Sequence, residues 1–523
     1  MSSKSRVQPE TPPTAIVTAE QMRQIEARLF DAGMPVPALM EKVAGQLTAR
    51  LMSLYPRAQF PRVGVIVGPG HNGGDALVVA RELHLNGYTV CCHQPLAKLK
   101  ELTASHARYA DHLGIRQCEQ LSELRDCDWL LDGLFGFGLT RDISGGLATL
   151  VDTLNSWSQP IASIDLPSGL QTDTGAVLGV AIRAAHTFCL GLWKRACFQD
   201  PALAYLGQVE LIDFGIPARD RQAILGSPPP LQCLTAAQAR VALPPPRPAV
   251  THKYQQGHLL LVCGSQRFAG GAILTGLGAR ASGVGMLSIA VPATLKLLLV
   301  SQLPEALIFA CPETESGAIA HLPADLDLDR FSAIAYGPGL TTAVPELLAT
   351  VLATTAPLIL DADGLNQLAA RSPKKTLAAR SGATILTPHA GEFQRLFPAI
   401  DPADRLVAVR AAAEQSGATV LLKGARTAIA GPEEDSTWVV PASTPALARG
   451  GSGDVLTGLL GGLLAQPAPA GASVALRTAV AAWWHARAGC RAAAEQTELG
   501  VDPLALSRYL IGSQTVEGDR SLK

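Results

Sequence analysis

The chain has 523 residues, of which 48% are hydrophobic and 17% charged, and its formal net charge at pH 7 is −1. This length predicts two or more domains, and this composition is typical of folded, well-buried domains rather than of disorder. The near-neutral charge argues against nucleic acid or an anionic membrane surface as partners, and the absence of an uninterrupted apolar run argues against a membrane-spanning helix.

The beginning of the chain and its cysteines bear on its location. The first residues, MSSKSRVQPETPPT, are polar and contain proline, without the apolar core of a signal peptide. The ten cysteines are scattered and form no C-x-x-C pair, which argues against a metal or disulfide framework. We expect a disordered tail at 1–14, a further tail at 513–523, and a cytoplasmic protein with reduced thiols.

The first structured segments predict two helices and a glycine-rich turn. Thr18 and Gln21 have the spacing of a capping box, and a second helix is expected from residue 39 onward. An apolar strand at 63–67 then leads directly into GPGHNGGDALVVAR (68–81). A strand, a glycine loop and a helix in this order are typical of the first βα turn of a Rossmann-like unit. Asn72 and Asp75 add polar side chains that a loop binding only phosphate would not need.

Further strands follow at α/β spacing, and several end in polar residues. The expected strands are 89–92, 129–131, 160–164, 187–190 and 209–212. Asp132 begins DGLFGFGLTRD (132–142), and Asp165 begins DLPSG (165–169). Because ligands bind at the carboxyl ends of strands in open α/β sheets, we expect these residues to converge on one crevice. Asn72, Asp132 and Ser168 are oxygen donors suited to a monovalent or hard divalent cation.

A proline-rich stretch separates the two halves of the chain. SPPPLQ (227–232) and LPPPRPAV (243–250) flank a short helical segment at 234–243. Because proline runs act as semi-rigid spacers, we place the domain boundary at about residue 225, giving domains at about 15–225 and 226–512. The helical segment is expected to pack on the second domain.

The second half repeats strands that end in reactive groups. A strand at 259–262 precedes a glycine-bearing loop, and later strands end in a Gly-Pro-Gly turn at 337–339, Asp361 and Asp363, His389 and Glu392, and Lys423. Alternating strands and helices predict a parallel sheet with helices on both faces. Two short segments around GPEEDS (431–436) predict a hairpin at the sheet edge.

The stretch ARGGSGDVLTGLLGGLLA (448–465) places three glycines before a predicted buried helix. A glycine-rich helix start binds anions through free backbone N–H groups and the helix dipole. We interpret Asp454 as a base beside a phosphate cradle, with an ordinary N-cap aspartate as the alternative. The reactive groups at the other strand ends favour catalysis by phosphoryl transfer, in which nearby carboxylates reach Mg²⁺ directly or through water. The chain has no Walker-A motif, so a P-loop enzyme is not expected.

The motifs of the first half resemble the NAD(P)H-hydrate epimerase domain. GPGHNGGDALVVAR, DGLFGFGLTRD and DLPSG, together with LMEKVAG (39–45), carry the resemblance over roughly residues 15–220. It implies K⁺ binding by Asn72, Asp132 and Ser168. It implies substrate contacts by His71, Asn72, Gly73, Gly74, Asp75, Gly136, Phe137, Gly138, Leu139, Thr140, Arg141, Asp142 and Asp165. Two residues depart from the family pattern, since His71 replaces the usual Asn and Ala76 the usual Gly. LWKRACF (192–198) lacks an expected glycine, so Lys194 is only a weak site candidate.

The motifs of the second half resemble the ribokinase-like superfamily and, more narrowly, the ADP-dependent NAD(P)H-hydrate dehydratases. GSQRFAGGA, LPEA, GPGL, DADGLN, LTPHAGEF, KGART and GGSGD carry the resemblance over roughly residues 235–512. It implies substrate contacts by Gly271, Gly339, His389 and Asp454. It implies nucleotide contacts by Lys423, Gly424, Ala425, Arg426, Thr427 and Gly453. Gly271 stands where the family commonly has Ala.

Together these patterns predict an α/β protein of two three-layer αβα domains, Rossmann-like and then ribokinase-like. The resemblances imply an enzyme that epimerises R- and S-NAD(P)HX and dehydrates the S form at the expense of ADP, yielding AMP and phosphate. We expect Asp165 to transfer a proton in the first domain and Asp454 to act as the base in the second. Two alternatives stay open, a small-molecule kinase with a nucleotide-binding first domain and a first domain that binds without catalysis. The sequence leaves open whether ADP or ATP is preferred, whether NADHX or NADPHX is preferred, and whether the chain forms a homo-oligomer.

Overall fold

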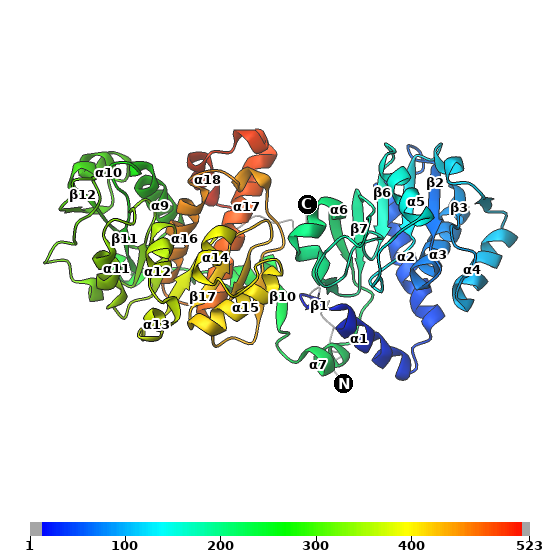
Figure 1. Ribbon diagram of the computed structural model, residues 1–523, viewed down its shortest axis with the longest axis horizontal. Helices are drawn as coiled ribbons and strands as arrows, with labels where there is room; N and C mark the ends of the chain where they lie inside the picture. Colours follow the sequence, from blue (N-terminus) through cyan, green and yellow to red (C-terminus); the bar gives the residue numbers. More distant parts are fainter. Residues whose placement is uncertain (1–12, 515–523) are drawn as a thin grey trace. The chain divides into compact units, whose positions relative to one another are not determined.

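The computed structural model describes residues 13–514, so the predicted tails lie almost entirely outside the described residues. The chain divides into two compact units between Leu231 and Gln232 (Figure 1). The sequence placed the boundary near residue 225, because a proline run hides the short strand β10 (Leu231–Cys233). This strand joins the sheet of the second unit.

The first unit is built on a seven-stranded parallel sheet of order β4-β3-β2-β5-β6-β7-β9. Its strands are β2 (Arg62–Val67), β3 (Thr89–His93), β4 (Arg116–Cys118), β5 (Trp129–Gly133), β6 (Ile161–Ile164), β7 (His186–Leu190) and β9 (Gln208–Ile212). Its helices are α1 (Ala19–Asp31), α2 (Val36–Leu54), α3 (His71–Leu85), α4 (Glu101–His112), α5 (Gly146–Asn155), α6 (Leu203–Leu206) and α7 (Ala218–Leu225).

Helices cover both faces of this sheet. Val65 packs in a cluster with residues of α2 and α3, whereas its neighbour Ile66 packs in a separate cluster with residues of α5. Alternate residues of a strand point to opposite faces, so the unit has three layers. The predicted capping box at Thr18 is confirmed at the start of α1.

Two parts of the first unit were not predicted. One is the edge strand β4, and the other is the parallel pair formed by β1 (Ile16–Val17) and β8 (Trp193–Lys194). Strands of two or three residues are too short to show an alternating pattern. The second omission matters for function, because β8 carries Lys194.

The second unit contains a ten-stranded sheet of order β10-β19-β18-β17-β16-β15-β14-β11-β12-β13. Its further strands are β11 (His258–Val262), β12 (Met286–Pro292), β13 (Leu307–Cys311), β14 (Ala333–Tyr336), β15 (Leu358–Leu360), β16 (Thr384–Leu386), β17 (Thr419–Leu422), β18 (Ala428–Ala430) and β19 (Thr437–Val439). In the sheet, the neighbouring strands β17, β16, β15, β14, β11, β12 and β13 are all parallel. Strands β18 and β19 form the predicted antiparallel hairpin. Strands β12 and β13 were not predicted.

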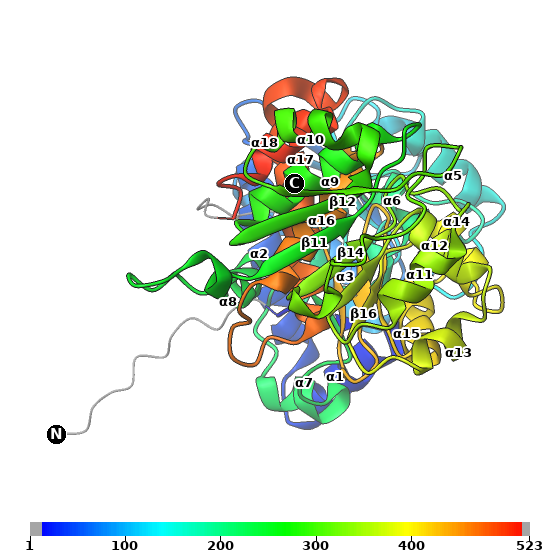
Figure 2. The ribbon, with the colours of Figure 1, turned by 90° about the vertical axis from the view of Figure 1, so that its left-hand side faces the viewer.

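The helices of the second unit lie on both sides of the strands, with α11 to α15 on one side and α9, α16, α17 and α18 on the other (Figure 2). They are α8 (Ala236–Ala242), α9 (Ala269–Ser282), α10 (Lys296–Gln302), α11 (Pro345–Leu352), α12 (Asp363–Ala369), α13 (Pro373–Ala378), α14 (Ala390–Leu396), α15 (Arg405–Ser416), α16 (Ser452–Ala465), α17 (Val474–Gly500) and α18 (Pro503–Leu510). Helix α8 packs on this unit's core, as predicted. The predicted α/β class is confirmed. No helix within residues 13–514 is long and apolar enough to span a bilayer.

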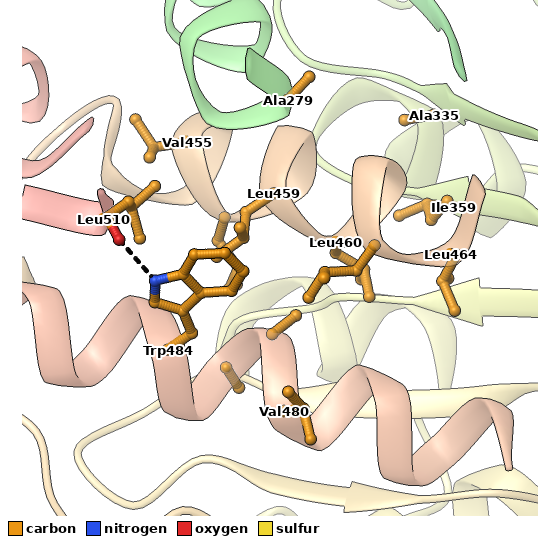
Figure 3. Close-up of a cluster of buried hydrophobic side chains, with 14 of the residues drawn as sticks. Ala279, Ala335, Ile359, Val455, Leu459, Leu460, Leu464, Val480, Trp484 and Leu510 are labelled. Carbon is orange, nitrogen blue, oxygen red and sulfur yellow. Dashed lines mark hydrogen bonds between the residues drawn. The ribbon is translucent and has the colours of Figure 1, made fainter. Parts of the chain in front are cut away.

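Helix α16, predicted from the stretch 448–465, is the central helix of the second unit. Its leucines, including Leu459 and Leu460, are fully buried between the sheet and α17, where Trp484 donates a hydrogen bond to the Leu510 carbonyl (Figure 3). Burying a leucine stabilises a fold by about 1.5–3 kcal/mol. A Cβ on Gly458 would lie 1.8 Å from the Thr275 carbonyl oxygen, so glycine is needed for the close contact with α9. This packing fixes the N-terminus of α16 in space.

Candidate active sites

The carboxyl ends of the central strands in the first unit open into a cavity of about 610 Å³. This volume lies within the usual range for small-molecule sites. Helices α1 and α2, the start of α3, the loop after β5 and the loop after β6 all contribute to its walls. Of the predicted substrate residues, those that line it are His71, Asn72, Asp75, Gly136, Phe137, Gly138, Leu139, Thr140, Arg141 and Asp165.

Three predicted substrate residues lie elsewhere. Gly73 and Gly74 are buried in the first turn of α3, where a Cβ on Gly73 would lie 1.9 Å from the Gly68 carbonyl oxygen. Glycine at this position lets α3 approach the turn after β2. Asp142 is exposed and is not among the residues lining the cavity.

Asp165 and Lys194 form a buried ion pair in this cavity, with 2.7 Å between Lys194 Nζ and Asp165 Oδ1. The Asp165 carboxylate also accepts a hydrogen bond from the Phe137 N–H at 2.9 Å. Its φ of 66° is left-handed, a strained conformation for a residue other than glycine and one that clusters at functional sites. Burial alone would lower the pKa of Lys194, but the charge of Asp165 raises it above its ordinary value. From the sequence Lys194 was only a weak site candidate, and its pairing with Asp165 was not predicted.

Two further carboxyl groups line the same cavity, Glu26 from α1 and Asp75 from α3. Burial raises the pKa of Glu26 to about 7, with Lys194 opposing that shift and Asp165 adding to it. Burial, and then the charges of Asp165 and Glu26, raise the pKa of Asp75 well above its ordinary value. Glu26 was missed. The available signal was an acidic residue at the edge of the helix face that buries Met22.

The three predicted cation ligands lie at neighbouring strand ends. Asp132 is buried and accepts hydrogen bonds from the hydroxyl and N–H of Ser168 at 2.6 and 2.9 Å. The Asn72 side chain has a buried amide nitrogen without a hydrogen-bond partner among the described residues. A Cβ on Gly136 would lie 3.1 Å from Asn72 Oδ1, so glycine leaves space beside this amide. The side-chain oxygens of Asn72, Asp132 and Ser168 are of the kind that a hard cation binds, whereas the unpaired Asn72 N–H₂ is a hydrogen-bond donor and needs a separate acceptor.

A second cavity, of about 480 Å³, lies at the N-terminus of α16 in the second unit. Three predicted substrate residues, Gly271, Gly339 and Asp454, line it together with Asp363 and the glycines that precede α16. A Cβ on Gly271 would lie 3.5 Å from Asp454 Oδ2 and 3.8 Å from the Gly339 nitrogen. The cavity therefore brings a carboxylate and a free helix N-terminus together.

Asp454 lies in the first turn of α16 and faces this cavity. The N-cap is Gly451, with a left-handed φ of 93°, and no side chain caps the helix, so the alternative interpretation of Asp454 as the N-cap is wrong. Burial and the charge of Asp361 raise the pKa of Asp454 to about 7, although Lys423 opposes the shift. A carboxyl with this pKa is ready to accept a proton near neutral pH.

Lys423 is held behind this turn by Asp361, with 2.8 Å between Lys423 Nζ and Asp361 Oδ1. Asp361 is buried and also accepts a hydrogen bond from the Thr457 hydroxyl at 2.6 Å. Burial would raise the pKa of Asp361, but Lys423 lowers it below its ordinary value. A Cβ on Gly453 would lie 3.6 Å from Lys423 Nζ, so the ammonium lies close to the start of α16. Asp361 is thus committed to an ion pair.

The remaining predicted residues of this unit are not among those that line the cavity. His389 is the N-cap of α14, and its Nδ1 accepts a hydrogen bond from the Gly391 N–H at 3.0 Å. The nucleotide loop 423–427 follows β17, where the Thr427 hydroxyl donates to the Gly424 carbonyl at 3.2 Å. In the part of the chain that the structure describes, no three His, Cys, Asp or Glu side chains group as a metal site.

Two family models match the chain. The model of the NAD(P)H-hydrate dehydratases matches residues 259–511, and that of the YjeF-related protein N-terminus matches residues 36–196. A bifunctional NAD(P)H-hydrate repair enzyme from Synechocystis is 59% identical over 497 residues, 95% of this chain and 94% of the relative. The enzyme of the same name from Mycobacterium tuberculosis is 34% identical, with 88% of this chain and 90% of the relative covered.

A solved structure is similar to the second unit. The crystal structure of the ADP/ATP-dependent NAD(P)H-hydrate dehydratase from Bacillus subtilis, co-crystallised with ATP and Mg²⁺, is 33% identical in sequence. It matches 53% of this chain and 96% of the bacterial chain, with a TM-score of 0.46.

Proposed function

The chain belongs to the family of bifunctional NAD(P)H-hydrate repair enzymes, and on that premise we propose which of its residues carry the two reactions. The first unit is the NAD(P)H-hydrate epimerase, and the second is the NAD(P)H-hydrate dehydratase, which uses a nucleotide. The observation that carries this conclusion is a relative of that name 59% identical over 95% of the chain. The two cavities supply separate sites for the two reactions.

In the dehydratase, we assign Asp454 as the general base. It removes the proton from the ring hydroxyl of S-NAD(P)HX while ADP transfers a phosphoryl group to that oxygen. The N–H groups at the start of α16 and the ammonium of Lys423 stabilise charge on the transferred group. Elimination of phosphate then restores the nicotinamide ring and leaves AMP.

Nucleotide binding is assigned to Lys423, Gly424, Ala425, Arg426, Thr427 and Gly453, and substrate contacts to Gly271, Gly339, His389 and Asp454. Mg²⁺ usually binds through substrate phosphates and one or two carboxylates. Because Asp361 is committed to Lys423, we assign Asp363, which lines the cavity, as the carboxylate available to such an ion. Mg²⁺ would neutralise phosphate charge.

In the epimerase, we assign Asp165 as a proton-transfer residue at the hydroxyl-bearing carbon of NAD(P)HX. Its ion pair with Lys194 and its bond from Phe137 fix the carboxylate in the cavity wall. Asn72, Asp132 and Ser168 would hold K⁺, which would order the loops that carry them. A cytoplasmic location is supported by all ten cysteines being free thiols within the described residues.

One assay tests this function. The full-length enzyme is given hydrated NADH as an epimer mixture, with ADP, Mg²⁺ and K⁺, and the product is followed by dihydronicotinamide absorbance and by chromatography that resolves the epimers. We expect both epimers to be consumed and NADH to be recovered. A stable phosphorylated product would favour the small-molecule kinase instead. Persistence of the R epimer would mean that the first unit binds without catalysis.

A further inference from the structure

Glu26 is a carboxyl group in the epimerase cavity to which the mechanism above gives no task. It projects from α1, whose N-terminus is fixed by the Thr18 capping box and by a hydrogen bond from the Ala19 N–H to Asp173 at 2.8 Å. The buried face of the helix, which includes Met22, anchors it on the core. The Glu26 carboxyl has no hydrogen-bond or ion-pair partner among residues 13–514. A charged side chain that faces a cavity from a fixed helix, without a protein partner, is available to a ligand.

Epimerisation imposes a requirement that one carboxylate does not meet. In a hydrated dihydronicotinamide the hydroxyl is on a carbon next to the ring nitrogen. When the hydroxyl accepts a proton, the C–O bond breaks, water leaves, and the nitrogen lone pair forms a C=N bond. Water then adds to the opposite face, a C–O bond forms, and a base removes the extra proton. One proton is delivered and one is removed, with no change of oxidation state, and the two transfers occur on opposite faces of the ring.

We propose that Glu26 is the second catalytic residue of the epimerase and exchanges protons with the substrate on one face of the ring while Asp165 serves the other. This inference rests on the epimerase function assigned above and adds the residue that completes its proton balance. The two carboxyls come from different walls of one cavity, since Glu26 projects from α1 and Asp165 follows β6. In one direction Glu26 donates and Asp165 accepts, and the roles reverse for the opposite epimer.

The charged groups around Glu26 support this role. They are Arg23 on the same helix, Asp75 on α3, Asp165 after β6 and Lys194 on β8. Lys194 is engaged by Asp165 at 2.7 Å, so it does not neutralise Glu26 by direct contact. Burial therefore dominates, and it raises the pKa of Glu26 to about 7. A group that is half protonated near neutral pH serves equally well as donor and acceptor.

Asp75 is the other carboxyl that could fill this role, and its environment argues against it. Burial and the charges of both Asp165 and Glu26 raise its pKa well above the ordinary value. The raised pKa favours the protonated form of Asp75, which can donate a hydrogen bond to substrate, as its predicted role as a contact residue requires. Of the two carboxyls that the ion pair with Lys194 leaves unengaged, we therefore assign the proton exchange to Glu26 and the contact to Asp75.

The test follows epimerisation alone, using full-length enzyme with K⁺ and R-NADHX in the absence of nucleotide, so that the dehydratase is idle. Initial rates are measured by epimer-resolving chromatography from about pH 5 to about pH 9 for wild type, Glu26→Gln, Glu26→Asp and the control Asp31→Asn. Asp31 ends the same helix and is exposed. We expect Glu26→Gln to lose about 10²- to 10⁴-fold in kcat with little change in KM, and to lose the wild-type inflection near pH 7. Glu26→Asp should restore part of the rate and the inflection, and Asp31→Asn should match wild type.

The outcomes separate this inference from the function on which it rests. If wild type does not interconvert the epimers, the epimerase assignment itself fails. If wild type is active but Glu26→Gln keeps its kcat and inflection, the role of Glu26 is overturned. It is also overturned if Glu26→Gln loses activity together with a lowered melting temperature that Glu26→Asp does not restore, because that result marks a structural residue.

Discussion

The two units contain the same two kinds of charged group, a lysine–aspartate ion pair and a carboxyl with a raised pKa. Each has a lysine paired with a buried aspartate, at 2.7 Å for Lys194 and Asp165 and at 2.8 Å for Lys423 and Asp361. Each also has a carboxyl whose pKa is raised to about 7 by burial and which has no hydrogen-bond or ion-pair partner within the described residues, Glu26 in the first unit and Asp454 in the second. Both units thus contain a lysine–aspartate ion pair and a carboxyl whose pKa is raised by burial.

The units differ in whether the aspartate of the ion pair lines the cavity. Asp165 lines the epimerase cavity, whereas Asp361 is not among the residues lining the dehydratase cavity and is further engaged by Thr457. On the proposed assignments, phosphoryl transfer needs one proton acceptor, and Asp361 serves only to position Lys423. Epimerisation needs a donor and an acceptor, and both proposed carboxyls of the first unit line its cavity. We therefore expect access to the cavity, and not pairing with lysine, to determine which carboxylate reacts.

The largest expected effect concerns Asp454. Asp454→Asn removes the proposed base but keeps the size of the side chain, so we expect dehydration of S-NADHX to fall by about 10²- to 10⁴-fold. ADP binding, measured by calorimetry, should be within a few-fold of wild type, and R-to-S epimerisation should be unchanged. If Asp454→Asn kept the wild-type rate of dehydration, Asp454 would not be the base. The comparison between Asp454 and Glu26 as proton-transfer residues would then fail.

Breaking the ion pair of the first unit should have a large effect on stability. Lys194→Met leaves Asp165 buried without its partner, and removing one member of a buried pair costs about 3–5 kcal/mol in the free energy of unfolding. Denaturant unfolding of the epimerase unit should show this loss. The double variant Lys194→Met, Asp165→Asn should recover part of it, because no uncompensated charge remains. An equal loss in both variants would mean that Lys194 acts through packing.

The two carboxyls with raised pKa values, Glu26 and Asp454, should lower the free energy of unfolding as pH rises. The folded pKa of Glu26, about 7, lies above its ordinary value of 4.5, so between these values the folded state holds more protons than the unfolded state and stability falls as pH rises. Glu26→Gln removes this penalty. It should raise the free energy of unfolding on the order of 2–3 kcal/mol above pH 7 and have little effect near pH 4.5.

Asp454→Asn should likewise raise the free energy of unfolding of the second unit above pH 7, since the pKa of Asp454 is also raised to about 7. Asp31→Asn serves as the control, because Asp31 is exposed on the surface of α1. Hydrogen exchange at several pH values measures each unit separately. A pH-independent difference in either variant would mean that the carboxyl does not change its protonation in that window.

Much of the fold and of the dehydratase site was predictable, for a physical reason. The strands of a parallel sheet are continuous apolar runs, and GGSGD precedes a long apolar helix, so both leave strong local patterns. Asp454 and the glycines Gly271 and Gly339 follow from motifs at strand ends. The predicted residues Gly73 and Gly74 lie away from the cavity, because a glycine motif does not distinguish close packing from ligand contact.

The residues that were missed depend on contacts between distant segments. Lys194, which forms the ion pair with Asp165, lies on β8, and neither this two-residue strand nor its partner β1 shows a pattern. Glu26 lies on an amphipathic helix whose polar side would ordinarily face solvent. Burial of that one carboxyl results from the packing of α1 on the unit, which a sequence window around residue 26 does not contain.

The smallest expected effect concerns His71, which stands where the epimerase resemblance expects Asn. His71 lines the cavity at the start of α3, and burial together with Lys100 lowers its pKa, so it is neutral at pH 7. A neutral imidazole donates and accepts one hydrogen bond each, as an amide does. We therefore expect His71→Asn to change kcat/KM for epimerisation by less than about tenfold, equivalent to about 1.4 kcal/mol. The exposed Asp142, tested as Asp142→Asn, should have no effect. A loss of several orders of magnitude in His71→Asn would make His71 a third proton-transfer residue, and the balance of one donor and one acceptor in the first unit would fail.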